Sequence, residues 1–147
     1  MDHVAVMKKS WGFIDKILSG EKTVESRWSV LKRKPWNAVR EGDTVYFKNS
    51  GEPVSARAGV RRVTQYADLT PTGVKKILNN YGGKDGMTVN DTPLFFQRFK
   101  NRKYCTLIFL KNPVRVGPFA IHKEGFGAMT AWISVPRISA IRYQEKE

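Results

Sequence analysis

The sequence has few of the residues on which metal, cofactor and disulfide chemistry depend. It contains a single cysteine, Cys105, and two histidines, His3 and His122. One cysteine cannot form an internal disulfide, which favours a reducing compartment. Two histidines and one cysteine this far apart give no metal-ligand spacing, and no glycine-rich phosphate loop or nucleophile elbow is present. We therefore expect neither a metal nor a cofactor.

Long apolar runs are also absent. No window approaches the roughly 18 apolar residues of a membrane-spanning helix. The first residues, MDHVAVMKKSWGF, lack the apolar core of a signal peptide, and no basic helix carries a strong apolar face. We expect a cytoplasmic protein without a membrane partner, while the oligomeric state stays open.

Acidic residues are scarce relative to basic ones. Thirteen Asp and Glu oppose 26 Lys and Arg, for a net charge of +13 and a pI near 10.1. Such an excess concentrates polyanions around a protein. The predicted partner is therefore RNA, another single-stranded nucleic acid or a nucleotide. The alternative is a basic surface that serves only solubility.

Hydrophobic periodicity predicts one α+β domain over residues 1–147, of a length sufficient for a core. Apolar stripes predict helices over 11–19 (capped by Ser10 and ended by Gly20), over 71–81 (capped by Thr70), and from Thr92 to Phe99. Strands are predicted at 3–7, 23–29, 44–47, 54–66, 104–110, 114–116, 133–135 and 138–143. Residues 144–147 are expected to be frayed. About six short strands with two or three helices indicate a small β-barrel, since closure removes exposed edges. Cys105 falls in a predicted buried strand and Trp132 in the predicted core.

The most informative segment is the octet Gly20–Arg27, which reads GEKTVESR. It brings Lys22, Glu25 and Arg27 together where a predicted helix ends and a predicted strand begins. Period-two alternation puts Glu25 and Arg27 on one face of that strand. Such a junction can hold charged groups on a rigid frame that is open to a ligand.

This octet fits the pattern G-x-K-x-x-E-x-R, and a strand of the form G-D-x-ϕ-x-ϕ (ϕ apolar) follows in Gly42–Gly51. In these residues the chain resembles the ASCH family of the PUA-like superfamily of small β-barrels, beside the EVE and YTH domains. Segments 107–113 and 131–133 are similar to later strands of EVE-type relatives. The resemblance implies a cleft between the barrel and the first helix, with a nucleobase or an RNA segment as ligand.

The resemblance also bears on catalysis. Some small bacterial members with a similar motif are amidohydrolases of acylated cytidine, and a ribonuclease activity is claimed within the family. In the amidohydrolases a catalytic lysine lies three residues before a catalytic threonine. Lys22 matches that lysine, but Glu25 stands at the threonine position. We therefore expect binding, and we keep as the alternative a small hydrolase of RNA or of an acylated nucleoside, with Lys22 and Glu25 as its catalytic residues.

Each charge of the octet has a chemical use. Lys22 suits phosphate or a carbonyl oxygen, and as a base or nucleophile it would need partial burial. Glu25 could orient Lys22 or accept a hydrogen bond from an exocyclic amine. Arg27 could clamp phosphate bidentately. The alternative is an ion network that only closes a strand edge.

Residues around the octet complete the predicted interface. Trp11 and Trp28 could stack on bases or belong to the core. Lys48, Asn49 and Ser50 could contact a ligand at the barrel mouth or simply form a turn. The loop 31–36, LKRKPW, interleaves basic and aromatic residues, as single-strand binders do, or is a solvated loop anchored by its tryptophan. The predicted nucleic-acid-binding residues are Lys8, Lys9, Ser10, Trp11, Lys22, Glu25, Arg27, Trp28, Lys48, Asn49, Ser50 and Arg57, of which Arg57 belongs either to a phosphate track or to an outer face.

Overall fold

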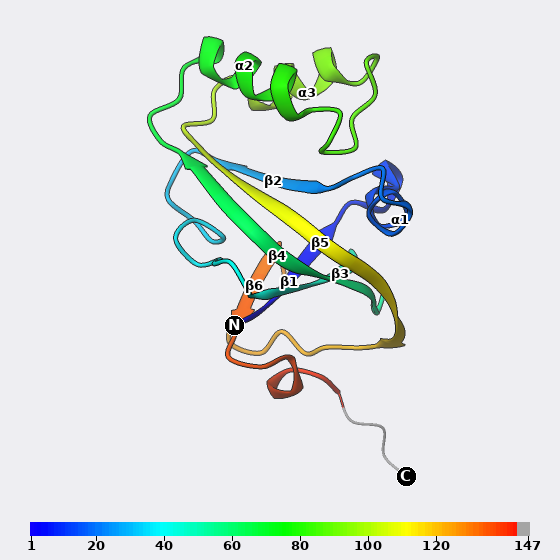
Figure 1. The fold of residues 1–147 in the computed structure, drawn as a ribbon. Coiled ribbons are helices and arrows are strands. Elements are labelled where there is room, and N and C mark those ends of the chain that lie inside the picture. The colour runs from blue at the N-terminus through cyan, green and yellow to red at the C-terminus, as the bar shows by residue number, and fades with distance from the viewer. Residues whose placement is uncertain (144–147) are drawn as a thin grey trace.

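The computed structural model describes residues 1–143, so the predicted frayed tail, 144–147, lies outside the described residues. A curved six-stranded sheet forms the centre of the molecule, and a layer of helices lies at one end of it (Figure 1). The strands are β1 (Asp2–Met7), β2 (Val24–Ser29), β3 (Thr44–Asn49), β4 (Val54–Tyr66), β5 (Tyr104–Phe119) and β6 (Trp132–Val135). The helices are α1 (Phe13–Ser19), α2 (Pro71–Tyr81) and α3 (Thr92–Phe99), with 3-10 turns η1 (Lys9–Trp11) and η2 (Ile138–Ala140).

The strands run in the order β2-β5-β4-β3-β1-β6. Only β1 and β3 pair in parallel, and the other neighbours are antiparallel. The long strands β4 and β5 cross the whole molecule, and α2 and α3 lie beyond β2 (Figure 1). The sheet is thus a mixed half-barrel, which confirms the predicted α+β class.

The buried apolar residues form two hydrophobic clusters. In the larger cluster, α1, α2 and α3 pack against strand residues such as Phe47 and Leu107. In the smaller one, Ile121 and Ile141 pack against β1 and β6. Cys105 is fully buried and Trp132 nearly so, as predicted.

Several element ends follow the predicted local chemistry. The Thr70 side chain accepts a hydrogen bond from the Gly73 amide at 3.2 Å and so caps α2. Gly20, at φ 84°, ends α1 with its amide on the Ile17 carbonyl. Ser10, by contrast, is not the N-cap of α1, because it lies within η1 and Gly12 occupies the N-cap position at φ 65°.

At the C-terminal side, one predicted break between strands and one predicted strand are wrong. Segments 104–110 and 114–116 belong to one strand, β5, because the shift of register between Arg57 and Gly59 of β4 accommodates the intervening Asn112 and Pro113. Segment 138–143 is not a strand. It forms η2, and its one pairing is a bridge between Ile121 and Arg142.

Candidate nucleic-acid interface

The octet forms the turn after α1 and most of β2. The turn is fixed by backbone hydrogen bonds, from Lys22 to the Lys16 carbonyl at 2.9 Å and from Thr23 and Val24 to the Lys84 carbonyl at 2.8 and 3.0 Å. The loop after α2, 82–91, therefore packs directly on the octet, and it brings Asp85 to β2.

Lys22 is almost fully buried, with 1% of its surface exposed. Its ammonium donates hydrogen bonds to the carbonyls of Val24 (2.7 Å) and Asp85 (2.6 Å) and to Asp85 Oδ1. The ammonium also lies 4.5 Å from the ring centroid of Phe13. An ammonium has three hydrogens, so these three acceptors saturate it. Lys22 holds the 82–91 loop against β2.

Asp85 is the acidic partner of this lysine. Besides Lys22, it accepts hydrogen bonds from the Ser26 amide at 3.2 Å and from the Ser26 hydroxyl. Burial raises the pKa of Asp85, and the nearby Glu25 carboxylate acts in the same direction, while the Lys22 ammonium opposes the shift. Both oxygens of Asp85 are thus engaged in holding the fold.

Arg27 connects the two edges of the sheet. Its guanidinium extends from the edge strand β2 to the opposite edge, where it donates to the carbonyls of Val6 and Ala131, each at 3.3 Å, and lies 5.3 Å from the ring centroid of Trp132. It also contacts Glu25 Oε2 at 3.4 Å. We call the gap between β2 and the opposite edge of the sheet, which the Arg27 side chain bridges in place of strand pairing, the seam.

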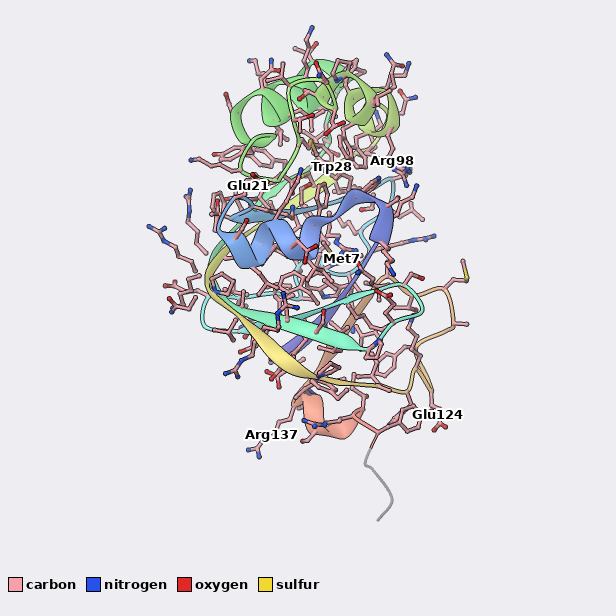
Figure 2. The ribbon with its side chains drawn as sticks, turned by 90° about the vertical axis from the view of Figure 1, so that its right-hand side faces the viewer. Met7, Glu21, Trp28, Arg98, Glu124 and Arg137 are labelled. Atoms are coloured by element: carbon pink, nitrogen blue, oxygen red, sulfur yellow. The ribbon has the colours of Figure 1, made fainter. Side chains whose placement is uncertain are left out.

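A pocket of about 280 Å³ lies on the helix side of the seam. We call it the inner pocket. Figure 2 shows Met7, Trp28 and Arg98 on this side of the molecule, where the helices meet the sheet. Glu25, Ser26 and Asp85 belong to its wall, whereas Lys22 does not. Its lining residues are Val6, Met7, Lys8, Trp11, Phe13, Glu25, Ser26, Arg27, Trp28, Asp85, Met87, Phe95, Arg98, Phe99 and Arg102.

Aromatic rings make up much of this wall. Trp28 stacks on Phe99 with centroids 4.9 Å apart and planes at 7°, and its indole N–H donates to Ser26 Oγ at 2.9 Å. Trp11 packs edge-on against Phe95 at 5.2 Å and lies 5.2 Å from the Arg98 guanidinium. Both tryptophans are half-buried, so each packs on the core and also borders the pocket.

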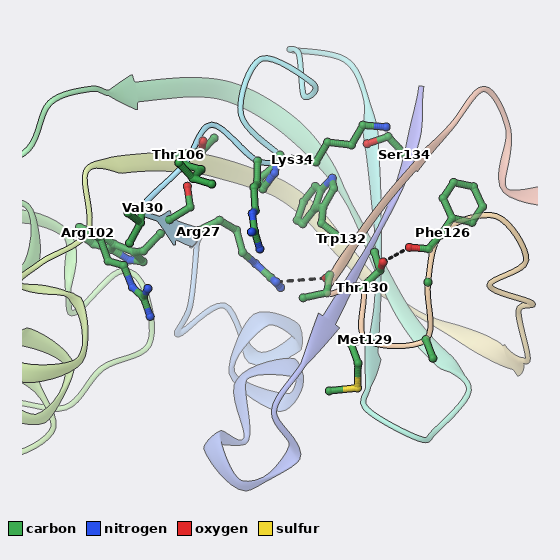
Figure 3. Close-up of a pocket in the computed structure, with 18 of the residues that line it drawn as sticks. Arg27, Val30, Lys34, Arg102, Thr106, Phe126, Met129, Thr130, Trp132 and Ser134 are labelled. Carbon is green, nitrogen blue, oxygen red and sulfur yellow. Dashed lines mark hydrogen bonds between the residues drawn. The ribbon is translucent and has the colours of Figure 1, made fainter.

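A larger cavity of about 1270 Å³ lies on the other side of the seam (Figure 3). We call it the basic groove. Four cationic side chains line it, and no acidic residue does so among the described residues. The lining comprises residues 27–31, 33–35, 102, 106, 125–132 and 134, with Arg27, Arg33, Lys34 and Arg102 as its cations.

The groove and the inner pocket share Arg27, Trp28 and Arg102, so they are adjacent hollows with these three residues in their common wall. In Figure 3, Lys34 and Arg27 extend into the groove from different elements. The Arg102 Nε atom is buried and has no hydrogen-bond partner within residues 1–143. Unpaired donors of this kind are suited to an anionic ligand.

The remaining residues predicted for the interface are distributed over several places. Lys8 and Trp11 line the inner pocket, and Ser10 borders a separate hollow of about 360 Å³ beside α3. Lys9 is exposed and paired with Glu52 at 2.7 Å.

Lys48, Asn49, Ser50 and Arg57 line neither the groove nor the inner pocket. Lys48 is buried, and its pKa is lowered because burial disfavours the ammonium and Lys123 is nearby. Asn49 bonds to Glu52 at 3.1 Å within the turn, and Ser50 and Arg57 are exposed.

Sequence reasoning did not single out Asp85, Arg98 or Arg102 for the site. Asp85 and Arg102 are distant from the octet in sequence and reach it only through the helical layer, so no local pattern marks them. Arg33 and Lys34 belong to the loop 31–36, whose mixture of basic and aromatic residues is typical of single-strand binders, so a sequence signal does indicate these two residues.

Solved structures of one protein have the same architecture. The structure of ASCH from Zymomonas mobilis superposes with a TM-score of 0.65 over 97% of this chain and 96% of that chain, at 15% identity. Two structures of its point mutants give TM-scores of 0.65 and 0.64 at 16% and 15% identity. This chain has the ASCH fold. The ASCH resemblance of the octet and the Gly-Asp strand is thereby confirmed at the level of the fold.

No protein-family model and no curated protein sequence matches the chain. Within residues 1–143, no helix has the length and apolar character needed to cross a membrane. In the same residues no group of three or more His, Cys, Asp or Glu is arranged to hold a metal ion.

Proposed function

We propose that this ASCH-fold protein binds RNA or another single-stranded nucleic acid in the basic groove, with one base in the inner pocket. The observation that carries the proposal is the groove itself, in which Arg27, Arg33, Lys34 and Arg102 face one cavity without an acidic residue in the lining. Positive charge gathered along a groove is what holds a phosphate backbone.

The size and walls of these two hollows favour a single strand. The volume of the basic groove, about 1270 Å³, exceeds the roughly 300–1,000 Å³ typical of small-molecule pockets, which suits an extended ligand. Trp28 borders both the groove and the inner pocket. Unpaired bases expose the faces that stack on such rings, whereas a duplex hides them.

The state of Lys22 favours binding over hydrolysis. A lysine that acts as nucleophile or base must offer a free electron pair to its substrate, yet the Lys22 ammonium is saturated by three acceptors and lies outside the pocket wall. In this proposal the lysine supports the site, and the cations of the groove contact the ligand.

A direct test is the affinity of a short fluorescein-labelled single-stranded RNA of mixed sequence, measured by anisotropy. Lys34→Ala and Arg102→Ala should each weaken binding by about 1 kcal/mol, which is roughly fivefold in Kd, because each removes a charge-assisted phosphate contact.

The matched controls are Lys75→Ala and Lys76→Ala, which remove the same charge from exposed positions of α2. They should leave the affinity nearly unchanged. Equal losses in the groove variants and the α2 variants would mean that net charge alone attracts RNA, and the groove would then not be the binding site.

A further inference from the structure

We propose that the inner pocket selects guanine, with the Glu25 carboxylate as acceptor for the Watson–Crick edge of the base. This inference rests on the proposed function, because it names the base that a strand bound in the groove would place in the inner pocket.

Glu25 is a buried acceptor with spare capacity. It is 4% exposed, yet its closest partners are Lys22 Nζ, 3.4 Å from Oε1, and Arg27 Nη2, 3.4 Å from Oε2. A carboxylate offers about four acceptor positions, and leaving them unused in a buried site is costly. Donors from a ligand would therefore be strongly favoured at this position.

Asp85 provides the internal comparison. It lies in the same wall, but its two oxygens accept hydrogen bonds from Lys22 and from the amide and hydroxyl of Ser26. Of the two acids in the wall of the inner pocket, Glu25 is thus the one whose oxygens can accept hydrogen bonds from a ligand.

Base chemistry then decides which ligand fits a carboxylate. Guanine presents two adjacent donors, N1–H and the N2 amino group, which match the two oxygens of a carboxylate. Adenine and cytosine present one amino group next to a ring acceptor, and uracil presents one N–H between two carbonyls. Next to an anionic carboxylate these acceptors are repelled, so guanine is the base with the best match.

The rest of the pocket suits the other groups of guanine. Its O6 and N7 atoms are acceptors for which arginine is the commonest partner in nucleic-acid complexes. Arg98 lines the inner pocket, where its guanidinium lies 5.2 Å from the ring centroid of Trp11. Trp28 and Phe99, stacked on each other, supply an aromatic wall for the face of the base.

The test compares labelled uridine-rich RNAs that are identical except for one central nucleotide. Inosine retains the N1–H, O6 and N7 groups of guanosine but lacks its N2 amino group, so this pair isolates one hydrogen bond to Glu25. We expect wild-type protein to bind the guanosine RNA roughly tenfold more tightly than the inosine RNA, and the adenosine and cytidine RNAs to bind less tightly than the guanosine RNA.

The variant Glu25→Gln should reduce the guanosine-to-inosine ratio toward unity, because a carboxamide replaces one of the two acceptor oxygens by a donor. The matched control is Glu21→Gln, an exposed position of the same octet, which should keep the ratio. The wild-type series does not depend on whether the Glu25 variant folds.

Equal affinity of wild-type protein for the guanosine and inosine RNAs would overturn the guanine proposal. If the uridine-rich RNAs still bound through Lys34 and Arg102 in that case, the proposed function would stand without it. If none of the RNAs bound, the proposed function would fail as well.

Discussion

At the scale of single residues, Gly86 shows how closely the buried Lys22 side chain is enclosed. Its φ is +89°, and a Cβ built on it would lie 3.2 Å from Lys22 Cδ and 3.3 Å from the Phe13 ring. The Gly86 carbonyl also accepts a hydrogen bond from Lys16 at 2.7 Å. One glycine therefore lets the 82–91 loop approach both α1 and the side chain that anchors it.

We expect Gly86→Ala to lower the free energy of unfolding by about 1–3 kcal/mol, because alanine rarely adopts this backbone conformation and its methyl group would press on Lys22. Urea unfolding followed by circular dichroism measures the change. Gly83→Ala is the matched control in the same loop, since its added Cβ meets nothing within 4 Å. A loss as large in the control would contradict the explanation.

At the scale of elements, His3 joins three parts of the sheet. Its Nε2 lies 2.8 Å from Asp43, directly before β3, and its Nδ1 lies 2.8 Å from Ser134 Oγ in β6. The Trp132 indole N–H, which can only donate, points to the same Nδ1 at 3.4 Å. The neutral ring therefore carries its proton on Nε2 and donates it to Asp43. Burial lowers the pKa of His3 even though Asp43 opposes that shift.

A pH dependence of stability follows. Below about pH 6.5, the usual value for histidine, the unfolded chain takes up a proton that the folded chain resists, so the free energy of unfolding should fall as pH drops from about 7 to 5.5. His3→Gln removes this titration and should flatten the profile over that window. Burial tends to raise the pKa of Asp43, but the hydrogen bonds from His3 and the Arg40 amide outweigh it, so this pKa is lowered. Asp43 therefore changes the free energy of unfolding only near and below the usual aspartate pKa of 3.8. Equal slopes for both proteins in urea unfolding at several pH values would refute this role of His3.

The elements also show what the sequence determines and what it leaves open. Helices α2 and α3 begin at Thr-Pro and Asp-Thr-Pro steps that constrain the chain locally, and they were predicted closely. The strand predicted over 138–143 failed because an apolar segment can cover a sheet as well as extend it. Asp85 and Arg102 could not be assigned to the site because their approach to β2 depends on how the helical layer packs.

At the scale of the whole molecule, the charge of +13 raises the encounter rate with any polyanion, whereas the groove determines how many phosphates are held. Four cations line the groove. With each phosphate contact contributing about −0.7 to the slope for a single strand, log Kobs against log salt should have a slope of about −3.

Lys34→Ala should reduce the magnitude of this slope by about 0.7, since it removes one contact. Anisotropy titrations over a series of potassium chloride concentrations measure both values. A wild-type slope near zero would mean that phosphates do not contribute to binding.

The seam has a consequence for the behaviour of the protein at high concentration. The two strands that end the sheet, β2 and β6, would each expose unpaired backbone groups, and such edges are templates for strand addition by another copy. Here Arg27 extends from one of these edges to the carbonyls of Val6 and Ala131 at the other, and a charged side chain in that position obstructs an incoming strand. The residue that lies in the common wall of groove and pocket thereby also protects the half-barrel from edge-to-edge aggregation.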